Sequence, residues 1–179
     1  MCKFVQVIYK PSLNLFLNLH YIPDIQRCYS QYSKYLQDDF AKFNENICFY
    51  LEQSFPFFWV VLDNNDDFMG FVALENPCGD EKTLYCAELL TCLDKKAWGS
   101  FSRYSAKVFL KKCFEELGIY KIKALVFPDN FRVSTLLKTS GFRYETTLKA
   151  ETLRMGKPQD IDIYAVYVPS PWGEWSILM

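Results

Sequence analysis

The spacing of apolar residues changes near the middle of the chain, and this change limits the possible fold more than any other feature. Three strand-like runs, residues 57–62, 68–74 and 83–93, follow one another and are separated by short polar loops. Apolar residues then recur every three or four positions over residues 106–117, and Gly118 is placed to end a helix. This order predicts an antiparallel meander followed by an amphipathic helix that packs on its sheet.

The flanking segments extend this pattern. Residues 25–54 carry two apolar stripes at helical spacing and predict two helices, and the exposed end of such a stripe can line a substrate cleft. The remaining predicted elements are a short apolar opening at 4–9, a strand at 121–127, a short helix after Asn130 that Gly141 closes, and final strands at 142–148 and 161–168. We therefore expect a mixed α/β (α+β) fold, in one domain spanning residues 1–179, with helices on both faces of the sheet.

Composition excludes several classes of protein. The net charge of −1 provides no field that would attract nucleic acid. The chain has seven cysteines in no CxxC pair and one histidine, so neither a structural zinc site nor a Cys-His hydrolase is expected, and no metal is predicted. The apolar runs are shorter than the roughly 20 residues of a membrane helix. We expect a cytoplasmic protein with reduced thiols that binds no membrane.

The segment between the strand at 83–93 and the central helix has the composition of an anion site. It contains Gly99, and it leads into a helix N-terminus, where backbone N–H groups and the helix dipole favour a pyrophosphate. Lys95, Lys96 and Arg103 add positive charge nearby. One glycine is a weak motif, and a tight turn without any ligand explains it equally well.

Six segments match a family signature in order, within about residues 57–168. They are Ala87-Glu88-Leu89-Leu90, Trp98-Gly99, Phe114-Glu115-Glu116-Leu117-Gly118, Asn130-Phe131-Arg132-Val133, Gly141-Phe142-Arg143-Tyr144-Glu145 and Asp160-Ile161-Asp162-Ile163-Tyr164. Through them the sequence resembles the GNAT superfamily of acetyl-coenzyme A dependent N-acetyltransferases, especially the branch of ribosomal-protein alanine acetyltransferases. The resemblance implies a GNAT-like, mostly antiparallel seven-stranded sheet with one parallel pair around the coenzyme.

The resemblance also implies a reaction and a coenzyme site. Acetyl-coenzyme A (acetyl-CoA) is the expected co-substrate, and a primary amine, either a protein N-terminus or a small molecule, is expected to attack its thioester directly. Backbone N–H groups of Thr91, Cys92 and Leu93 are expected to polarise the thioester carbonyl. Asn130 either holds the pantetheine arm or only caps a helix. The remaining expected coenzyme residues are Lys96, Ala97, Trp98, Gly99, Ser100, Phe101, Ser102 and Arg103.

Glu88 is the expected general base, because it matches the position of a carboxylate beside the acceptor amine. Its alternative role is a structural ion pair. Leu137 replaces the tyrosine that serves many members as general acid, so Ser134 and Tyr164 are the candidates for that role. Phe101 stands where a small residue is usual. These departures leave an alternative open, a catalytically degenerate module that binds acyl-CoA or a partner.

The last eleven residues, 169–179, form an apolar tail that contains Trp172, Trp175, Ile177 and Leu178. Such a tail must be covered. Docking on its own domain and formation of a homodimer are the two explanations, and we favour docking.

Overall fold

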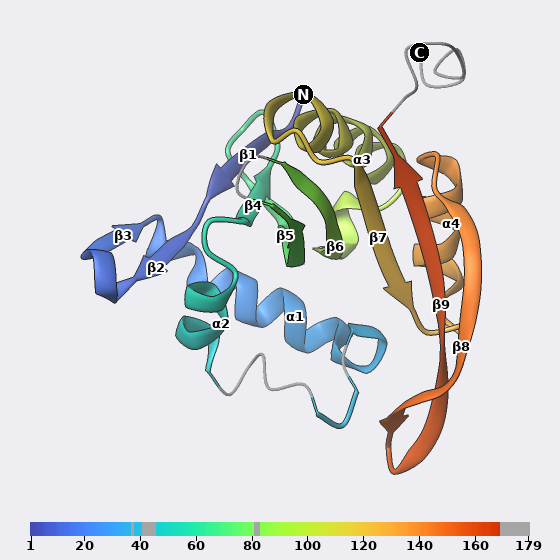
Figure 1. Cartoon of the computed structure of the whole chain (residues 1–179). Helices are drawn as coiled ribbons and strands as arrows, with labels where there is room; N and C mark the ends of the chain where they lie inside the picture. Colours follow the sequence, from blue (N-terminus) through green and yellow to red (C-terminus); the bar gives the residue numbers. More distant parts are fainter. Residues whose placement is uncertain (37, 41–45, 81–82, 169–179) are drawn as a thin grey trace.

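The computed structural model describes residues 1–36, 38–40, 46–80 and 83–168 (Figure 1). Its centre is a seven-stranded sheet of strand order β1-β4-β5-β6-β7-β9-β8, in which only β6 and β7 are parallel neighbours. The strands are β1 (Lys3–Gln6), β4 (Phe58–Leu62), β5 (Phe68–Gly79), β6 (Leu84–Leu93), β7 (Lys121–Val126), β8 (Arg143–Arg154) and β9 (Lys157–Tyr167). The predicted fold class is confirmed. The predicted docking of the tail at 169–179 lies outside the described residues.

Helices cover both faces of this sheet, and each face has its own apolar core. On one face, α1 (Ile22–Leu36) and α2 (Ile47–Gln53) pack against residues such as Phe58 and Phe71. On the other face lie α3 (Ser100–Lys111), the π-helical turn η4 (Lys112–Glu116) that continues it, and α4 (Phe131–Thr139). The shorter elements are the hairpin strands β2 (Ile8–Lys10) and β3 (Leu15–Leu17) and the 3₁₀ turns η1 (Pro11–Leu13), η2 (Leu19–Tyr21) and η3 (Lys95–Ala97). Within the described part of the chain, no helix has the length and apolar character needed to cross a membrane.

The central helix packs as its periodicity predicts. Phe109, Cys113 and Phe114 are 2%, 0% and 8% exposed and belong to the core cluster between α3 and the sheet. Phe101, in the first turn of α3, also packs against this cluster. Its side chain is therefore partly buried.

The parallel neighbours β6 and β7 pair over only three residues each. Their pairing begins at Cys86 and Lys121 and stops at Glu88 and Lys123, although both strands continue beyond that point. In Figure 1 the two strands diverge from there. The sheet thus contains a wedge between the later residues of β6 and those of β7.

The hairpin of β8 and β9 is longer than predicted, and its tip reaches the segment after α1 (Figure 1). Thr152 Oγ1 donates a hydrogen bond of 2.6 Å to Asp38 Oδ2. The backbone N–H groups of Met155 and Gly156 donate to the carboxylate of Asp39, each at 2.8 Å. The hairpin therefore forms a wall opposite α1 and α2, across the wedge.

Candidate active site

Two cavities meet at the wedge between β6 and β7. The first has a volume of about 700 Å³, and we name it the acidic cavity because Asp38, Glu75, Glu88 and Glu151 line it. The second has a volume of about 710 Å³, and we name it the α3–α4 cavity after the helices that flank it. Five residues line both: Tyr35, Leu36, Thr91, Asn130 and Val133. The two cavities are therefore direct neighbours, separated by no more than these five residues.

Gly99 opens α3 at the mouth of the α3–α4 cavity. Its φ of 98° and ψ of −125° form a conformation that residues with a Cβ rarely adopt. No side chain caps this end of the helix, and the first-turn N–H groups of an α-helix have no partner within it. The amides at the start of α3 are therefore free to bind an anion.

Among the predicted coenzyme residues, not every backbone N–H is free to bind a phosphate. The N–H of Ala97 donates to Asp94 O at 2.9 Å, that of Trp98 to Lys95 O at 3.2 Å, and that of Arg103 to Gly99 O at 3.3 Å. These three amides already have backbone partners. The candidate phosphate donors are therefore the amides of residues 99–102.

Two guanidinium groups line the α3–α4 cavity, from Arg103 on α3 and Arg132 on α4. Arg132 stacks over the ring of Trp98 at 4.1 Å from its centroid, and Trp98 Nε1 donates to Leu93 O at 3.2 Å. The carboxylate of Asp129, which also lines the cavity, pairs with Arg154 at 2.8 Å. The cavity thus offers positive charge beside the free helix end. Arg103 was predicted from the sequence and Arg132 was not, although Arg132 lies within a matched segment.

The other predicted coenzyme residues fall into two groups. Thr91, Cys92, Leu93, Trp98, Gly99, Ser102, Arg103 and Asn130 line the α3–α4 cavity, whereas Lys96, Ala97, Ser100 and Phe101 are not among its lining residues. The side chain of Cys92 is buried, and its Sγ lies 3.5 Å from that of Cys28. The hydrogen bond to Cys28 and burial raise the pKa of the Cys92 thiol, so it is no nucleophile.

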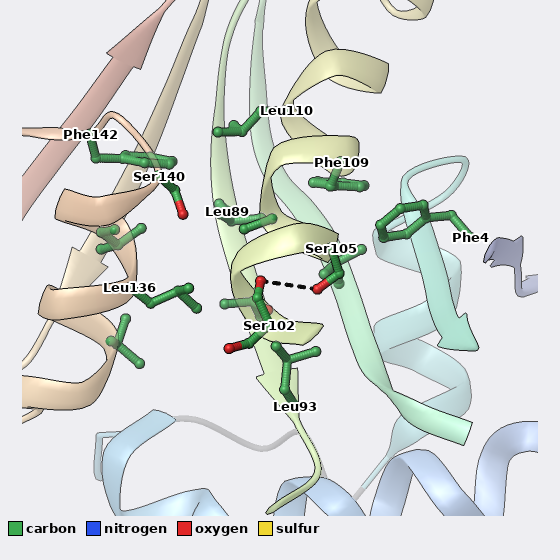
Figure 2. Close-up of a pocket in the computed structure, with 15 residues that line it drawn as sticks. Phe4, Leu89, Leu93, Ser102, Ser105, Phe109, Leu110, Leu136, Ser140 and Phe142 are labelled. Atoms are coloured by element: carbon green, nitrogen blue, oxygen red, sulfur yellow. Dashed lines mark hydrogen bonds between the residues drawn. The ribbon is translucent and has the colours of Figure 1, made fainter. Parts of the chain in front are cut away.

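A small apolar cavity lies beneath this region, between α3, α4 and the sheet (Figure 2). Its volume is about 30 Å³, room for roughly one water molecule. Ser105 Oγ donates to Ser102 O at 3.1 Å, and the buried Ser140 Oγ has no hydrogen-bond partner among the described residues. This small cavity is thus far too small for a coenzyme, which leaves the two larger cavities as the candidate ligand sites.

Asn130 is 9% exposed and lies between both large cavities and the start of α4. Its side-chain oxygen accepts a hydrogen bond of 3.5 Å from the N–H of Val133, which caps the helix. Its backbone oxygen accepts from Ser134. Capping is therefore present, and the same side chain borders the junction of the cavities.

Glu88 lines the acidic cavity at the point where β6 and β7 separate. Its carboxylate accepts hydrogen bonds from Lys123 Nζ at 2.9 Å and from Asn76 Nδ2 at 2.8 Å. The structural ion pair that sequence analysis weighed against catalysis is thus present. The same Glu88 side chain also lines the acidic cavity.

The structure does not bring Ser134 or Tyr164 to either large cavity. Ser134 is 8% exposed, and its Oγ donates to Asn130 O at 3.2 Å within its own helix. Tyr164 is 4% exposed and packs between the ring of Tyr144 and Lys138, whose Nζ lies 5.8 Å from the ring centroid. Both side chains belong to the core under α4, so their predicted role as general acid has no support from their position.

Two residues of the junction were missed by sequence analysis. Glu75 follows the apolar run 68–74 directly and lines the acidic cavity. Tyr35, near the end of α1, lines both cavities, and of the five residues shared by them it alone carries an ionisable side chain. The sequence indicated that the exposed end of a helical stripe in residues 25–54 can line a substrate cleft. It did not indicate that Tyr35 is the residue at that position.

The family can be assigned from the sequence itself. A family model described as an acetyltransferase (GNAT) domain matches residues 13–143, well over half of the chain. The chain belongs to the GNAT acetyltransferase family. The predicted GNAT resemblance and the prediction of an acyl-transferring enzyme of the N-acetyltransferase class are thereby confirmed.

Solved GNAT structures share the fold at low sequence identity. A putative phosphinothricin N-acetyltransferase matches with a TM-score of 0.72 and 15% identity, over 95% of this chain and 100% of its own. The spermidine N-acetyltransferase of Vibrio cholerae, in complex with CoA and spermine, matches with a TM-score of 0.71 and 19% identity, over 93% and 95%. RimJ of Mycobacterium smegmatis, in complex with CoA-disulfide, matches with a TM-score of 0.69 and 17% identity, over 84% and 79%. A search of curated proteins finds no match to the sequence.

Proposed function

We propose that this protein transfers the acetyl group of acetyl-CoA to the primary amine of a cationic acceptor, by direct attack of the amine on the thioester. The coenzyme occupies the α3–α4 cavity and the acceptor occupies the acidic cavity. The observation that carries this proposal is the meeting of the two cavities at the wedge between β6 and β7. Direct transfer requires such a junction, because both substrates must be bound at once.

The α3–α4 cavity fits coenzyme A chemically. The free amides of residues 99–102 and the guanidinium groups of Arg103 and Arg132 suit its phosphates. Beyond Glu88, β6 has no pairing with β7, which supports the proposal that backbone N–H groups near Thr91 to Leu93 polarise the thioester carbonyl.

The acidic cavity favours an acceptor with positive charge. Four carboxylates line it, and no lysine or arginine is among the described lining residues. The pair with Lys123 offsets the charge of Glu88 in part. A polyamine fits this chemistry better than an uncharged peptide segment. The Vibrio cholerae spermidine N-acetyltransferase, which shares the fold, was solved in complex with CoA and spermine. We therefore rank small cationic amines above protein N-termini.

No residue has yet been assigned as the general acid, because Leu137 replaces the usual tyrosine. We propose Tyr35 for this role. Its place at the junction of the cavities puts it near the departing thiolate. The coenzyme thiol resembles cysteine in its reference pKa of about 8.5, so it leaves partly unaided near neutral pH. Protonation of the departing thiolate by the Tyr35 hydroxyl is therefore expected to increase the rate only modestly.

The proposed function is tested by calorimetry with acetyl-CoA and by assay of thiol release with a panel of amines. The panel contains spermidine, spermine, a monoamine and peptides with free N-termini. We expect coenzyme binding in the micromolar range and turnover that is highest with the polyamines. Binding without turnover on any amine would support the degenerate acyl-CoA-binding module instead. No binding at millimolar acetyl-CoA would overturn the proposal.

Replacing Tyr35 with phenylalanine is expected to lower kcat roughly tenfold, below the 10²–10⁴ usual for a general acid, because the thiolate is a fair leaving group. The affinity for acetyl-CoA should stay within about threefold. Tyr104→Phe is the matched control, since Tyr104 is an exposed tyrosine of α3 that lines neither large cavity. Equal kcat values in the two variants would remove Tyr35 from the mechanism.

A further inference from the structure

Two carboxylates of the acidic cavity lie side by side in the sheet. Glu75 of β5 is the direct antiparallel partner of Glu88 of β6. Directly opposed residues of an antiparallel pair project from the same face of the sheet. Both carboxylates line the cavity, on the face that α1 and α2 cover.

The surroundings of these two carboxylates differ. Glu88 is held by the cation of Lys123 and by Asn76. Glu75 accepts a hydrogen bond from the neutral hydroxyl of Tyr50 on α2, and no lysine or arginine of the described chain forms an ion pair with it. Glu88 thus has a cationic partner, whereas Glu75 has none among the described residues.

We propose that Glu75 is the general base of the acetyl transfer, that Glu88 holds the positive charge of the acceptor, and that Tyr50 positions the Glu75 carboxylate. This inference rests on the proposed function. It assigns to Glu75 the proton transfer that sequence analysis assigned to Glu88.

The proton balance of the reaction is complete with these groups. The Glu75 carboxylate takes one proton from the acceptor ammonium and becomes a carboxylic acid, which leaves a neutral amine. The amine nitrogen forms a bond to the thioester carbon, the C–S bond breaks, and the second proton of the nitrogen goes to the departing thiolate. Glu75 then releases its proton to solvent through the cavity. The products are an N-acetyl amine, free coenzyme A and one proton.

The electrostatics of Glu75 agree with this role. Burial raises the pKa of its carboxyl, the hydrogen bond from Tyr50 lowers it, and the charge of Glu88 raises it. The net shift is upward. A carboxylate with an elevated pKa is a better base near neutral pH, because the driving force for proton transfer increases while the ionised form persists.

Three variants test the assignment through the pH profile of kcat/KM for the amine. Glu75→Gln is expected to lower kcat about 100-fold or more and to remove the acidic limb. Tyr50→Phe should move this limb to higher pH, because the hydrogen bond that lowers the pKa of Glu75 is lost. Glu88→Gln should move the limb to lower pH, because it removes the charge that raises this pKa, and should mainly raise KM for the amine.

The control is Glu52→Gln on α2, which removes a carboxylate that pairs with Lys10 outside both cavities. Its profile should match that of the wild type. Circular dichroism and acetyl-CoA affinity within about threefold identify variants that remain folded. A Glu75→Gln enzyme with an unchanged limb, or loss of the limb in Glu88→Gln instead, would overturn the assignment to Glu75. A wild-type protein that neither binds acetyl-CoA nor turns over would overturn the proposed function, which is a separate result.

Discussion

Replacing Gly99 with valine is expected to raise the Kd for acetyl-CoA at least tenfold, a loss of about 1.4 kcal/mol or more. With φ at 98° and ψ at −125°, a β-branched residue at this position must change the turn and move the amides of residues 99–102. A Cβ built on Gly99 meets nothing of the protein within 4 Å. The space that it would enter is therefore open, and in the proposed complex the phosphates of acetyl-CoA would occupy it. Calorimetry on the purified variant gives the Kd.

Gly118→Val is the matched control for this experiment. Gly118 also has a positive φ, +66°, and a Cβ there also meets nothing within 4 Å. It follows the π-helical turn at the far end of the central helix, away from both large cavities. We expect both variants to lose stability and only Gly99→Val to lose coenzyme affinity. Equal Kd values would place the phosphates elsewhere.

The sheet and its two helical layers were predictable because local periodicity reflected burial. The stripe at 106–117 predicted which face of α3 is buried, and residues 25–54 predicted α1 and α2. The parallel pair came from the family resemblance, since the meander itself has only antiparallel neighbours. The candidate anion site was predictable in outline, because it depends on a glycine before a helix N-terminus and this pattern is visible in the sequence.

The strand β5 shows where such prediction fails. The sequence Asn76-Pro77-Cys78-Gly79 has the composition of a loop, so the strand was expected to end at Leu74. In the structure β5 continues to Gly79, with register shifts between Glu75 and Cys78 and a positive φ of 46° at Asn76. Bulges allow a strand to carry a proline and an αL residue. Because the strand continues, Glu75 is paired with Glu88, and local composition does not show this.

The positions of Ser134 and Tyr164, the candidates for the general acid, could not be predicted from the sequence for another reason. Ser134 and Tyr164 were candidates because of their positions along the chain, but chain position does not show which face of α4 or β9 meets the core. Tyr35 reaches the junction only because the end of α1 packs across the sheet. Contacts between elements far apart in sequence determine these positions, and neither spacing nor composition encodes them directly.

Replacing Gly70 with alanine is expected to lower the free energy of unfolding by about 3 kcal/mol, since backbone strain and crowding of a packed site each cost roughly 1–3 kcal/mol. Gly70 pairs with Leu93 across β5 and β6, and its φ is +141°. A Cβ there would lie 2.4 Å from Cys92 O and 2.7 Å from Leu93 Cα. Both contacts are with backbone, so β6 itself must move. Urea denaturation gives the difference in unfolding free energy.

Because Cys92 and Leu93 lie on the part of β6 proposed to polarise the thioester, the Gly70 variant should lose turnover as well as stability. The variant Gly156→Ala separates the two causes of instability in Gly70→Ala, which are backbone strain and crowding. Gly156 has a φ of +69°, and a Cβ there meets nothing within 4 Å. The free energy of unfolding of Gly156→Ala should therefore fall only by the strain of a left-handed backbone, roughly 1–2 kcal/mol. This variant should keep full kcat. Equal losses of stability in the two variants, or full kcat in a folded Gly70→Ala protein, would show that β6 tolerates displacement and that its backbone does not position the thioester.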